Sequence, residues 1–542
     1  MHGLMQHEPM MISDLLRHAA RYHPRSEIVS RRPDGVHRQT YPETERRARR
    51  LAQALIRLGI APGDRVATLA WNSHRHVELY FAISGIGAVI NTINPRLAHD
   101  DIAYIADHAE DRVIFADVDF APILAAVVPK LAARPRHIVF LNDSGDIQDC
   151  TLPASISVSA YETLIAAEDG DYEWPRFEET TASGLCYTSG TTGKPKGVLY
   201  SHRSTVLLAM AVNAADACGL RAADRLMPVV PMFHVNAWSL PYAAAACGAS
   251  LIMPGRFLDG ASLAGLIADE HVTISAGVPT VWLGVLDHLR ETGQRLPSLQ
   301  RLVIGGSACP PALFEQFDAL GVEIRHAWGM TESSPLATLA APVAGVDADA
   351  AANQRLSQGR TIFGVELRAR DEKATEVPWN GKTQGNIELR GHWVATGYYR
   401  MPKGTTADGW FPTGDVGTID PDGFVYLTDR TKDLIKSGGE WISSIALENI
   451  AVAHPAVAEA AAIAAKHRKW GERPLLIVAL RPGASLTKAE LLAFYEDKVP
   501  RWSVPDDVIF IDELPHGATG KLLKTALRSR FGDYFIRAED VV

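Results

Sequence analysis

The chain has 542 residues, of which 47% are hydrophobic and 22% are charged, and its formal net charge is -9. A chain of this length exceeds one ordinary domain, so we expect roughly two to four domain-sized units with an ample core. The composition is that of a globular protein, and a negative charge without a basic block argues against a nucleic-acid partner.

Cysteine usage and the N-terminal residues bear on the location of the protein. The five cysteines have no metal-ligand spacing and an odd count, so we expect reduced, mostly buried thiols and a cytoplasmic protein. The N-terminus lacks the basic start and long apolar core of a signal peptide. No apolar run approaches about eighteen residues, so we expect no integral membrane span. The cysteines are Cys150, Cys186, Cys218, Cys247 and Cys309.

Helical and strand-like segments alternate over more than half of the chain. Apolar residues between Leu15 and Leu58 recur at helical spacing, which predicts a helical region in two pieces. Short β-rich runs that alternate with helices then predict α/β layers with mostly parallel sheets. In chain order we expect a strand at 64–70, a helix near 76–87, a strand at 113–116, a helix at 121–132 and a strand at 137–141, and then a second series from about residue 204 with strands at 251–253, 272–276, 301–304 and 322–325.

The pattern changes near residue 360, where short alternating runs separated by glycine turns predict a smaller β-rich unit. The last part of the chain has α+β character. We place the main boundary at Lys432, which gives a large N-terminal domain over 1–431 and a small C-terminal domain over 432–542. The expected strands of the β-rich unit are 387–390, 397–399 and 417–427.

The segment 187–197 reads Tyr-Thr-Ser-Gly-Thr-Thr-Gly-Lys-Pro-Lys-Gly and is the most informative part of the chain. Glycines let the backbone turn tightly and bring N–H groups to a ligand, while hydroxyls add donors and lysines add positive charge. Such a loop is typical of polyphosphate binding, although a solvated connection is the alternative for a run that stands alone. It is not a Walker A loop, because Pro195 follows Gly193-Lys194 where that motif requires Ser or Thr.

Two later segments place a polar or flexible group among apolar residues. The run 231–238 carries His234 between aromatic and aliphatic neighbours, and a core turn with a satisfied histidine is the alternative interpretation. The run 305–308 begins with two glycines after a strand-like stretch. Those glycines suit either a flat ligand that approaches the backbone or a simple tight turn.

Three more segments bring charged side chains. Glu332 ends the run Trp-Gly-Met-Thr-Glu directly after an expected strand, where open α/β sheets place ligands. A carboxylate beside a triphosphate is repelled unless a cation intervenes, so we expect Mg²⁺ there; a helix-capping surface glutamate is the alternative. Asp415, in Thr-Gly-Asp, suits the vicinal hydroxyls of a ribose, and Lys521 lies on a glycine-flanked loop near the C-terminus. Each of these two is a common turn or surface feature when it stands alone.

In order and spacing, these six segments resemble the acyl-adenylate-forming superfamily, which includes acyl-CoA synthetases, peptide-synthetase adenylation domains and beetle luciferases. The resemblance covers nearly the whole chain. The runs 231–238, 328–332 and 438–443 look most like medium- and long-chain fatty acyl-CoA synthetases and 3-methylmercaptopropionate-CoA ligases. The implied fold is a large α/β N-terminal domain of layered subdomains with a β-rich subdomain, followed by a small mobile α+β C-terminal domain.

The resemblance implies a nucleotide site built from the phosphate loop and from strand ends. Glu332 and Thr188 would hold Mg²⁺, Asp415 and Arg430 would hold the ribose, and Trp328 would pack on the adenine. The expected ATP-binding residues are Thr188, Ser189, Gly190, Thr191, Thr192, Gly193, Lys196, Gly306, Ser307, Ala308, Ala327, Trp328, Gly329, Met330, Thr331, Asp415 and Arg430, with Lys194 and Lys196 as gates of the loop.

The resemblance also implies two half-reactions that use ATP, Mg²⁺ and CoA. In the first, Lys521 would bridge the attacking carboxylate and the α-phosphate, which lowers the repulsion between two anions. Rotation of the small domain about a hinge at Lys432 would then bring Lys436 to the site for the second. The expected acyl pocket contains His234, Val235, Trp238, Gly306 and Trp441, and His234 would be its gate. His234 is also counted as catalytic, together with Lys521 and Lys436. Gly438 and Gly439 would lie along the CoA passage.

Several functions stay open at this point. The leading prediction is an ATP-dependent ligase that joins a medium- or long-chain fatty acid to CoA and releases AMP and pyrophosphate. A short acid such as 3-methylmercaptopropionate is the first alternative, and an adenylation protein that serves a separate carrier protein is an alternative of another class. A luciferase-like oxygenase and a non-catalytic nucleotide binder are less favoured, the latter because Lys521 and Glu332 are both present. Acyl chain length is open because each buried methylene adds about 0.8 kcal/mol and pocket depth leaves no sequence pattern. A homodimer is also left open.

Overall fold

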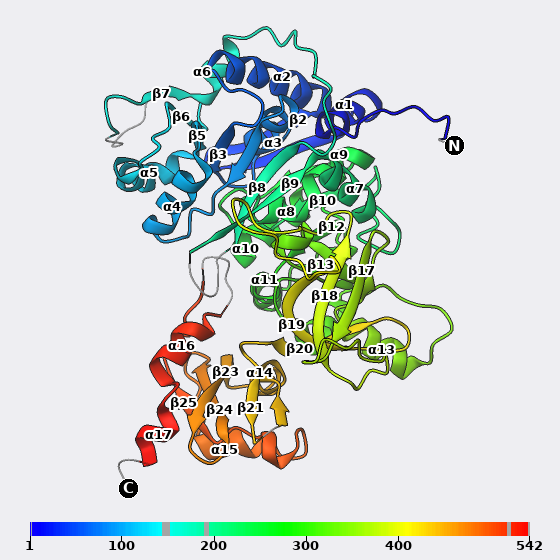
Figure 1. The fold of residues 1–542 in the computed structure, drawn as a ribbon, viewed down its shortest axis with the longest axis vertical. Coiled ribbons are helices and arrows are strands. Elements are labelled where there is room, and N and C mark those ends of the chain that lie inside the picture. Colours follow the sequence, from blue (N-terminus) through cyan, green and yellow to red (C-terminus); the bar gives the residue numbers. More distant parts are fainter. Residues whose placement is uncertain (2, 144–151, 189–193, 439, 518–521, 540–542) are drawn as a thin grey trace.

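A seven-stranded sheet lies in the upper part of the N-terminal domain (Figure 1). The computed structural model describes residues 1, 3–143, 152–188, 194–438, 440–517 and 522–539. The strand order is β7-β6-β5-β3-β4-β8-β9, and only the β8–β9 pair is antiparallel. The strands are β3 (Arg65–Leu69), β4 (Val89–Thr92), β5 (Val113–Ala116), β6 (His137–Phe140), β7 (Ser157–Ala160), β8 (Ala182–Thr188) and β9 (Lys196–Ser201), and the helices between them are α3 (His74–Gly85), α4 (His99–Ala109), α5 (Ala121–Val127) and α6 (Tyr161–Ala166).

A nine-stranded sheet follows, in the order β16-β15-β14-β13-β12-β10-β11-β1-β2. Its central strands from β14 to β1 are parallel, and the pairs β1–β2, β14–β15 and β15–β16 at the two edges are antiparallel. The strands are β1 (Glu27–Arg32), β2 (Gly35–Thr40), β10 (Arg225–Pro228), β11 (Ser250–Met253), β12 (Ile274–Gly277), β13 (Arg301–Ile304), β14 (Glu323–Gly329), β15 (Leu336–Leu339) and β16 (Arg360–Thr361). The helices are α1 (Ile12–Tyr22), α2 (Tyr41–Arg57), α7 (His202–Val212), α8 (Val235–Trp238), α9 (Leu240–Cys247), α10 (Gly260–Asp269), α11 (Pro279–Thr292), α12 (Pro311–Ala319) and α13 (Ala348–Leu356).

Helix α3 packs between the two sheets. All 12 of its residues are buried, and it contacts β1 of one sheet and β4 and β8 of the other. A helix buried on every side is usually apolar all round, yet α3 carries Arg75 and Glu78. Because a buried charge is costly unless it is paired, these side chains need partners on the surrounding elements.

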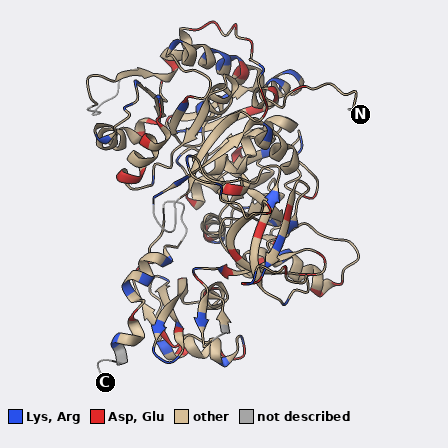
Figure 2. Cartoon of the chain, viewed as in Figure 1, with Lys and Arg blue, Asp and Glu red and all other residues tan. Residues whose placement is uncertain are grey.

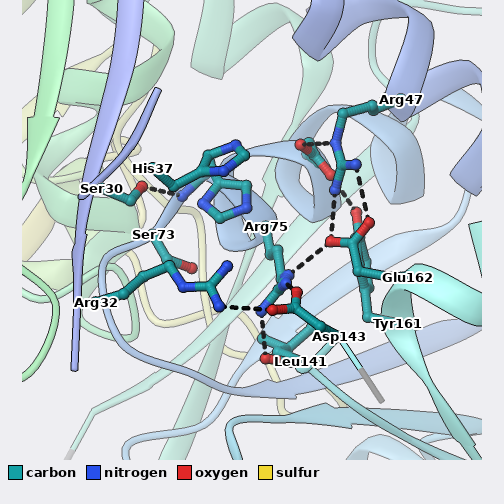
Figure 3. Close-up of polar contacts among 12 residues, drawn as sticks. Ser30, Arg32, His37, Arg47, Ser73, Arg75, Leu141, Asp143, Tyr161 and Glu162 are labelled. Carbon is teal, nitrogen blue, oxygen red and sulfur yellow. Dashed lines mark hydrogen bonds and ion pairs between the residues drawn. The ribbon is translucent and has the colours of Figure 1, made fainter. Parts of the chain in front are cut away.

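Three arginines supply such pairing and tie the two sheets together (Figure 3). Arg47 of α2 donates two hydrogen bonds to the Glu162 carboxylate of α6, at 2.9 and 2.8 Å. Arg75 donates to the same carboxylate at 2.9 Å and also pairs with Asp143, which follows β6. Arg32 at the end of β1 donates to Asp143 at 2.6 Å. The cluster therefore links the nine-stranded sheet to α2, α3 and α6 around the seven-stranded sheet.

The rest of the chain forms two smaller units. An antiparallel four-stranded sheet contains β17 (Val365–Arg370), β18 (Gly385–Gly391), β19 (Phe411–Ile419) and β20 (Val425–Arg430). The C-terminal domain lies below it in Figure 1 and has separate apolar clusters on the two faces of its sheet. Its elements are β21 (Ile435–Ser437), β22 (Glu440–Ile442), α14 (Ser444–Val452), β23 (Val457–His467), β24 (Gly471–Leu480), α15 (Lys488–Ala493), β25 (Asp507–Phe510), α16 (Lys524–Phe531) and α17 (Tyr534–Glu539).

The predicted α/β class and the large-plus-small organisation are confirmed, and three local predictions need correction. The region between Leu15 and Leu58 does contain two helices, but the β1–β2 hairpin separates them. The helix expected at 121–132 ends at Val127, because Pro129 cannot continue its hydrogen bonds. The segment 397–399 is not a strand and makes only an isolated bridge from Gly397.

Charges of both signs are interspersed over the described chain (Figure 2), in keeping with a formal net charge of -9. Within the described residues, no helix is both long and apolar enough to cross a membrane. Burial raises the pKa of the Cys186 and Cys218 thiols to about 11. Since the thiolate is the reactive form, burial keeps both cysteines in the less reactive thiol form.

Candidate active site

The predicted phosphate loop begins at the end of β8 and ends at the start of β9, and these two strands pair as an antiparallel hairpin. Thr188 at the end of β8 pairs directly with Lys196 at the start of β9, and both side chains are half-buried. Gly197 packs so closely on the Tyr187 ring that an added Cβ would lie 3.1 Å from it, which explains the glycine. The expected ligands Ser189, Gly190, Thr191, Thr192 and Gly193 lie outside the described residues.

The two loop lysines each lie over an aromatic ring. Lys194 Nζ is 4.6 Å from the centroid of Tyr104, on α4. Lys196 Nζ is 5.0 Å from the centroid of Tyr398, in the segment between β18 and β19. An ammonium within about 6 Å of a ring face is attracted by the ring quadrupole, so both lysines are held beside the loop and their charges are kept available to a ligand.

Glu332 lies in the turn that follows β14, and its side chain is only 5% exposed. Its Oε1 accepts a hydrogen bond of 2.6 Å from the Tyr398 hydroxyl. Burial and the adjacent Glu332 carboxylate raise the pKa of Tyr398, so its phenol keeps the proton that it donates. Tyr200 of β9 donates to the neighbouring Thr331 carbonyl at 2.8 Å. Glu332 is thereby fixed against both the hairpin and the 395–399 segment.

The chemistry of this carboxylate fits the expected Mg²⁺. Magnesium prefers oxygen ligands and takes few of them from protein carboxylates. In the part of the chain that the structure describes, Tyr398 occupies Oε1 of Glu332, and no donor reaches its Oε2. Oε2 is not among the fully buried side-chain atoms that lack a hydrogen-bond partner, so it is open to a ligand such as a cation.

The predicted ribose residues meet on neighbouring strands. Asp415 of β19 and Arg430 of β20 are direct cross-strand partners, and Arg430 Nε lies 3.1 Å from Asp415 Oδ1. The Trp328 indole, at the end of β14, donates to Asp415 Oδ2 at 3.2 Å. The structure therefore brings together an indole, a carboxylate and a guanidinium that lie far apart in the sequence.

Close backbone approach explains the glycines that follow β13. A Cβ on Gly305 would lie 2.6 Å from the Ala327 carbonyl oxygen. Gly306 has a φ of +82°, and a Cβ there would lie 3.3 Å from Val278 and 3.7 Å from Trp238. Gly306 and Trp238, both predicted for the acyl pocket, are therefore adjacent. The exposed residues Gly306, Ser307 and Ala308 lie at this strand end.

The expected acyl-pocket segment has an unusual backbone. Five consecutive residues, Val235–Ser239, have φ between 45° and 63°, and left-handed conformation costs about 1–2 kcal/mol per non-glycine residue. Cys186 of β8 holds the segment, because its Sγ donates to Asn236 Oδ1 at 3.3 Å, and Tyr80 of α3 holds the residues just before it through a hydrogen bond from its hydroxyl to the Met232 carbonyl. Half-buried His234 begins the segment. Strain of this kind is common at ligand sites.

The predicted C-terminal residues lie in the small domain, well away from the β8–β9 hairpin (Figure 1). Lys436 and Trp441 are cross-strand partners in the β21–β22 hairpin, and Lys436 Nζ lies 5.4 Å from the Trp441 ring. Gly438 has a φ of +60°, and its added Cβ would meet Trp470 at 2.9 Å. Gly439 and Lys521 lie outside the described residues. In this arrangement the β21–β22 hairpin, which carries Trp441, lies apart from α8, which carries Trp238 (Figure 1).

Sequence reasoning missed two aromatic residues of the site, Tyr104 and Tyr398. Both act through lysines of the loop, and Tyr398 also holds Glu332. The available signal was weak, since Tyr398 belongs to a Gly-Tyr-Tyr run that resembled a strand. Its partner Glu332 is 66 positions away in the chain, so no local pattern points to the pair.

Comparisons with known families agree with this geometry. Residues 16–399 match a family described as AMP-binding enzyme, and residues 446–521 match the AMP-binding enzyme C-terminal domain. Among solved structures, the anthranilate CoA ligase in complex with anthranoyl-AMP is 26% identical with a TM-score of 0.85, covering 96% of this chain and 98% of that one.

Two curated relatives are similar over their whole length. The medium-chain-fatty-acid–CoA ligase of Ectopseudomonas oleovorans is 49% identical over 100% of this chain and 99% of its own. The 3-methylmercaptopropionyl-CoA ligase of Ruegeria lacuscaerulensis is 50% identical over 98% of this chain and 99% of its own.

Proposed function

This chain belongs to the AMP-binding enzyme family as an AMP-forming acid–CoA ligase, and we propose that its substrate is a medium- or long-chain fatty acid. The acid and ATP would give acyl-AMP and pyrophosphate, and CoA would then give acyl-CoA and AMP. The observation that carries the ligase activity is the meeting of Trp328, Asp415 and Arg430, and the 49% identity to a medium-chain-fatty-acid–CoA ligase supports the acyl chain length. A short acid is the second candidate, because a relative that acts on 3-methylmercaptopropionate is 50% identical.

The described residues have distinct tasks in the first half-reaction. Asp415, held by Trp328 and Arg430, would accept hydrogen bonds from the ribose hydroxyls. Glu332 and Thr188 are the residues that would hold Mg²⁺, which when bound neutralises charge on the phosphates. Lys196 adds a positive charge at the opposite strand of the hairpin.

Lys521 is the residue to which we assign the electrostatic part of adenylation. A carboxylate oxygen bonds to the α-phosphorus while the bond to pyrophosphate breaks, so negative charge builds up between two anions. An ammonium group at that point stabilises the transition state, and loss of a comparable donor costs about 10²–10³ in rate. We assign Lys521 on the family resemblance, because it lies outside the described residues.

The second half-reaction needs a different arrangement of the small domain. The CoA thiol bonds to the acyl carbonyl carbon, AMP leaves, and the thiol proton is released. We propose that residues 432–542 turn about Lys432 against residues 1–431, so that Lys436, Gly438 and Gly439 replace Lys521. The separation of β21–β22 from the β8–β9 hairpin in Figure 1 supports two arrangements, since these residues must travel to act.

The acyl pocket is proposed to lie along the left-handed segment. Trp238, Val235 and Gly306 would contact the acyl chain, with His234 at the entrance. Trp238 packs on the Gly305–Gly306 backbone, 3.4 Å from the position of a Cβ on Gly305. Each additional buried methylene is worth about 0.8 kcal/mol, so the depth behind Trp238 sets the preferred length. We also propose a cytoplasmic location and a homodimer, the latter testable by light scattering.

A panel of acids tests the proposal. CoA-dependent AMP release would be measured with straight-chain acids from about three to about sixteen carbons and with 3-methylmercaptopropionate, because affinity should rise with each methylene until the pocket is full. We expect kcat/KM to peak at a medium or long chain. A peak at 3-methylmercaptopropionate would select the second candidate, and the lack of AMP release with every acid would contradict the ligase.

A further inference from the structure

We propose that Tyr398 is a positioning residue for the adenylation step: its hydroxyl orients Glu332 toward the metal, and its ring keeps Lys196 apart from that carboxylate. This inference rests on the proposed function, in which Glu332 holds Mg²⁺. Tyr398 touches two groups of opposite charge, through its hydroxyl on one and its ring face on the other.

The segment that carries Tyr398 is fastened at several points to the nucleotide site. The Tyr398 hydroxyl donates to Glu332 Oε1 at 2.6 Å, and the Ala395 N–H donates to the Glu332 main-chain carbonyl at 2.7 Å. The Tyr399 N–H donates to the Gly197 carbonyl of β9 at 2.8 Å. Main-chain hydrogen bonds thus hold the segment between Glu332 and the hairpin, and the Tyr398 hydroxyl determines the orientation of the Glu332 carboxylate.

The orientation of Glu332 follows from this single side-chain bond. A carboxylate has two oxygens, and a donor on one of them limits rotation and leaves the other for a different ligand. Because Tyr398 satisfies Oε1 and limits the rotamers of the buried Glu332, Oε2 is already oriented to bind Mg²⁺. Loss of the hydroxyl would leave a carboxylate that is 5% exposed without this donor.

The ring of Tyr398 has a separate effect on charge. Lys196 Nζ lies 5.0 Å from the ring centroid, and a T-shaped contact with Phe411, at 6.1 Å between centroids, supports the ring from another side. In the described part of the chain, no ion pair joins Lys196 to Glu332. A direct pair would neutralise both the cation needed by the phosphates and the anion needed by the metal. The ring therefore keeps two opposite charges available at short range.

The first experiment measures metal binding without turnover. Mn²⁺ would be titrated into enzyme with ATP and no acid, followed by electron paramagnetic resonance, for wild type, Tyr398→Phe and the matched control Tyr399→Phe. Tyr398→Phe removes only the hydroxyl, and one lost hydrogen bond to a charged group predicts about tenfold weaker Mn²⁺ binding. Tyr399 acts through its main-chain N–H, so Tyr399→Phe should bind like wild type.

The second experiment separates positioning from catalysis. In ATP–pyrophosphate exchange, Tyr398→Phe should need about tenfold more Mg²⁺ for half-maximal rate and recover to within about twofold at saturation. Tyr398→Leu removes the ring as well and should also raise the KM for ATP. Thermal unfolding of both variants controls for loss of structure.

The outcomes separate this inference from the function on which it rests. Wild type without magnesium-dependent exchange would refute the proposed function, and Glu332→Gln with wild-type metal dependence would refute the metal assignment. If Glu332→Gln is impaired while Tyr398→Phe binds Mn²⁺ and uses Mg²⁺ as wild type does, only the Tyr398 inference is overturned.

Discussion

Two boundaries in the molecule are held by charged and polar side chains, but they differ in how the contacts are shared. One is the arginine cluster between the two large sheets, and the other is the set of contacts between the β-rich unit and the C-terminal domain. We call the first the inner joint. It is made of Arg32, Arg47, Arg75, Asp143 and Glu162 (Figure 3), together with Glu78, which pairs with Arg47. Within it, Glu78 is fully buried and accepts from Arg47 at 2.7 Å, from Tyr161 at 2.5 Å and from Gln39 at 2.8 Å. Several donors thus share each carboxylate.

We call the second the outer joint, made of Thr428, Asp429, Ser443, Ser444, Glu448 and Lys524. Asp429 of β20 accepts from the N–H of Ser444 at 2.7 Å and from its hydroxyl at 2.5 Å. Lys524, at the start of α16, donates to the same hydroxyl at 2.5 Å and pairs with Glu448 at 2.6 Å. Ser443 also donates to the Thr428 carbonyl at 2.5 Å, so two adjacent serines carry these contacts across the domain boundary.

This difference indicates which boundary is built to move. Shared carboxylates and bidentate arginines make the inner joint redundant, so no single change of geometry releases it. The outer joint depends on two short side chains, those of Ser443 and Ser444. It lies next to the nucleotide site, because Asp429 is followed by Arg430, the partner of Asp415. The comparison supports a rigid N-terminal domain and a C-terminal domain that can turn near Lys432.

Breaking the inner joint should have the largest effect on stability. Arg47→Ala leaves the buried Glu78 without a guanidinium and leaves Glu162 with that of Arg75 alone, and loss of one partner of a buried pair costs about 3–5 kcal/mol. The free energy of unfolding, measured by urea denaturation, should fall by that amount. Arg57→Ala on the same helix removes a pair whose arginine is 52% exposed and should cost about 1 kcal/mol or less. Equal losses in the two variants would contradict the rigid inner joint.

Removing Lys521, in the C-terminal domain, should lower catalytic activity without lowering stability. We expect Lys521→Ala to slow acyl-adenylate formation by about 10²–10³ and to leave thioester formation from preformed acyl-adenylate nearly intact. Single-turnover assays of each half-reaction, with urea denaturation alongside, would show this. Equal loss of both half-reactions would reject the assigned role.

Cutting the outer joint should change the balance between domain arrangements. Ser444→Ala removes the hydroxyl that links Lys524 to Asp429, and one hydrogen bond of about 1 kcal/mol predicts about a fivefold shift away from the observed arrangement. Fluorescence energy transfer between labels on the two domains would measure the shift. Ser529→Ala, at an exposed position of α16, is the matched control. An unchanged distribution in Ser444→Ala would show that the serine does not hold the boundary.

Acid should destabilise the buried helix α3, which lies beside the inner joint, and this is the smallest of the expected effects. Burial, followed by the nearby His37, lowers the pKa of His74 well below its ordinary value of 6.5. The unfolded chain binds this proton as the pH falls below about 6.5 while the native protein does not, so the free energy of unfolding decreases there, by about 1 kcal/mol over the first pH unit. His74→Phe keeps the ring stacked on His37 and should reduce that slope by one proton. An identical slope in the variant would contradict the assignment.

How well the sequence predicts a contact depends on how far apart the two contacting residues lie in the chain. The alternating strands and helices and the β8–β9 loop follow from local runs of residues, whereas the pair Asp415–Arg430 came from the family resemblance. That resemblance and the α/β class are confirmed. The β1–β2 hairpin had a local signal in Pro33-Asp34-Gly35, a typical turn, which the helical pattern around it obscured.

Other features had no such signal. The left-handed run at 235–239 contains Val, Ala and Trp, which favour right-handed conformation when considered alone. Arg47 and Glu162 of the inner joint are 115 positions apart, and Tyr398 and Glu332 are 66 apart. Contacts of this kind arise when sheets pack, so they leave no periodic trace in the chain.

The most direct test of the account is ATP–pyrophosphate exchange by the wild-type enzyme without CoA. We predict that labelled pyrophosphate enters ATP only when Mg²⁺ and a suitable acid are both present, because acyl-AMP formation is reversible and precedes the thiol. Exchange that requires CoA, or its absence with every acid from about three to about sixteen carbons, would contradict the acyl-adenylate mechanism.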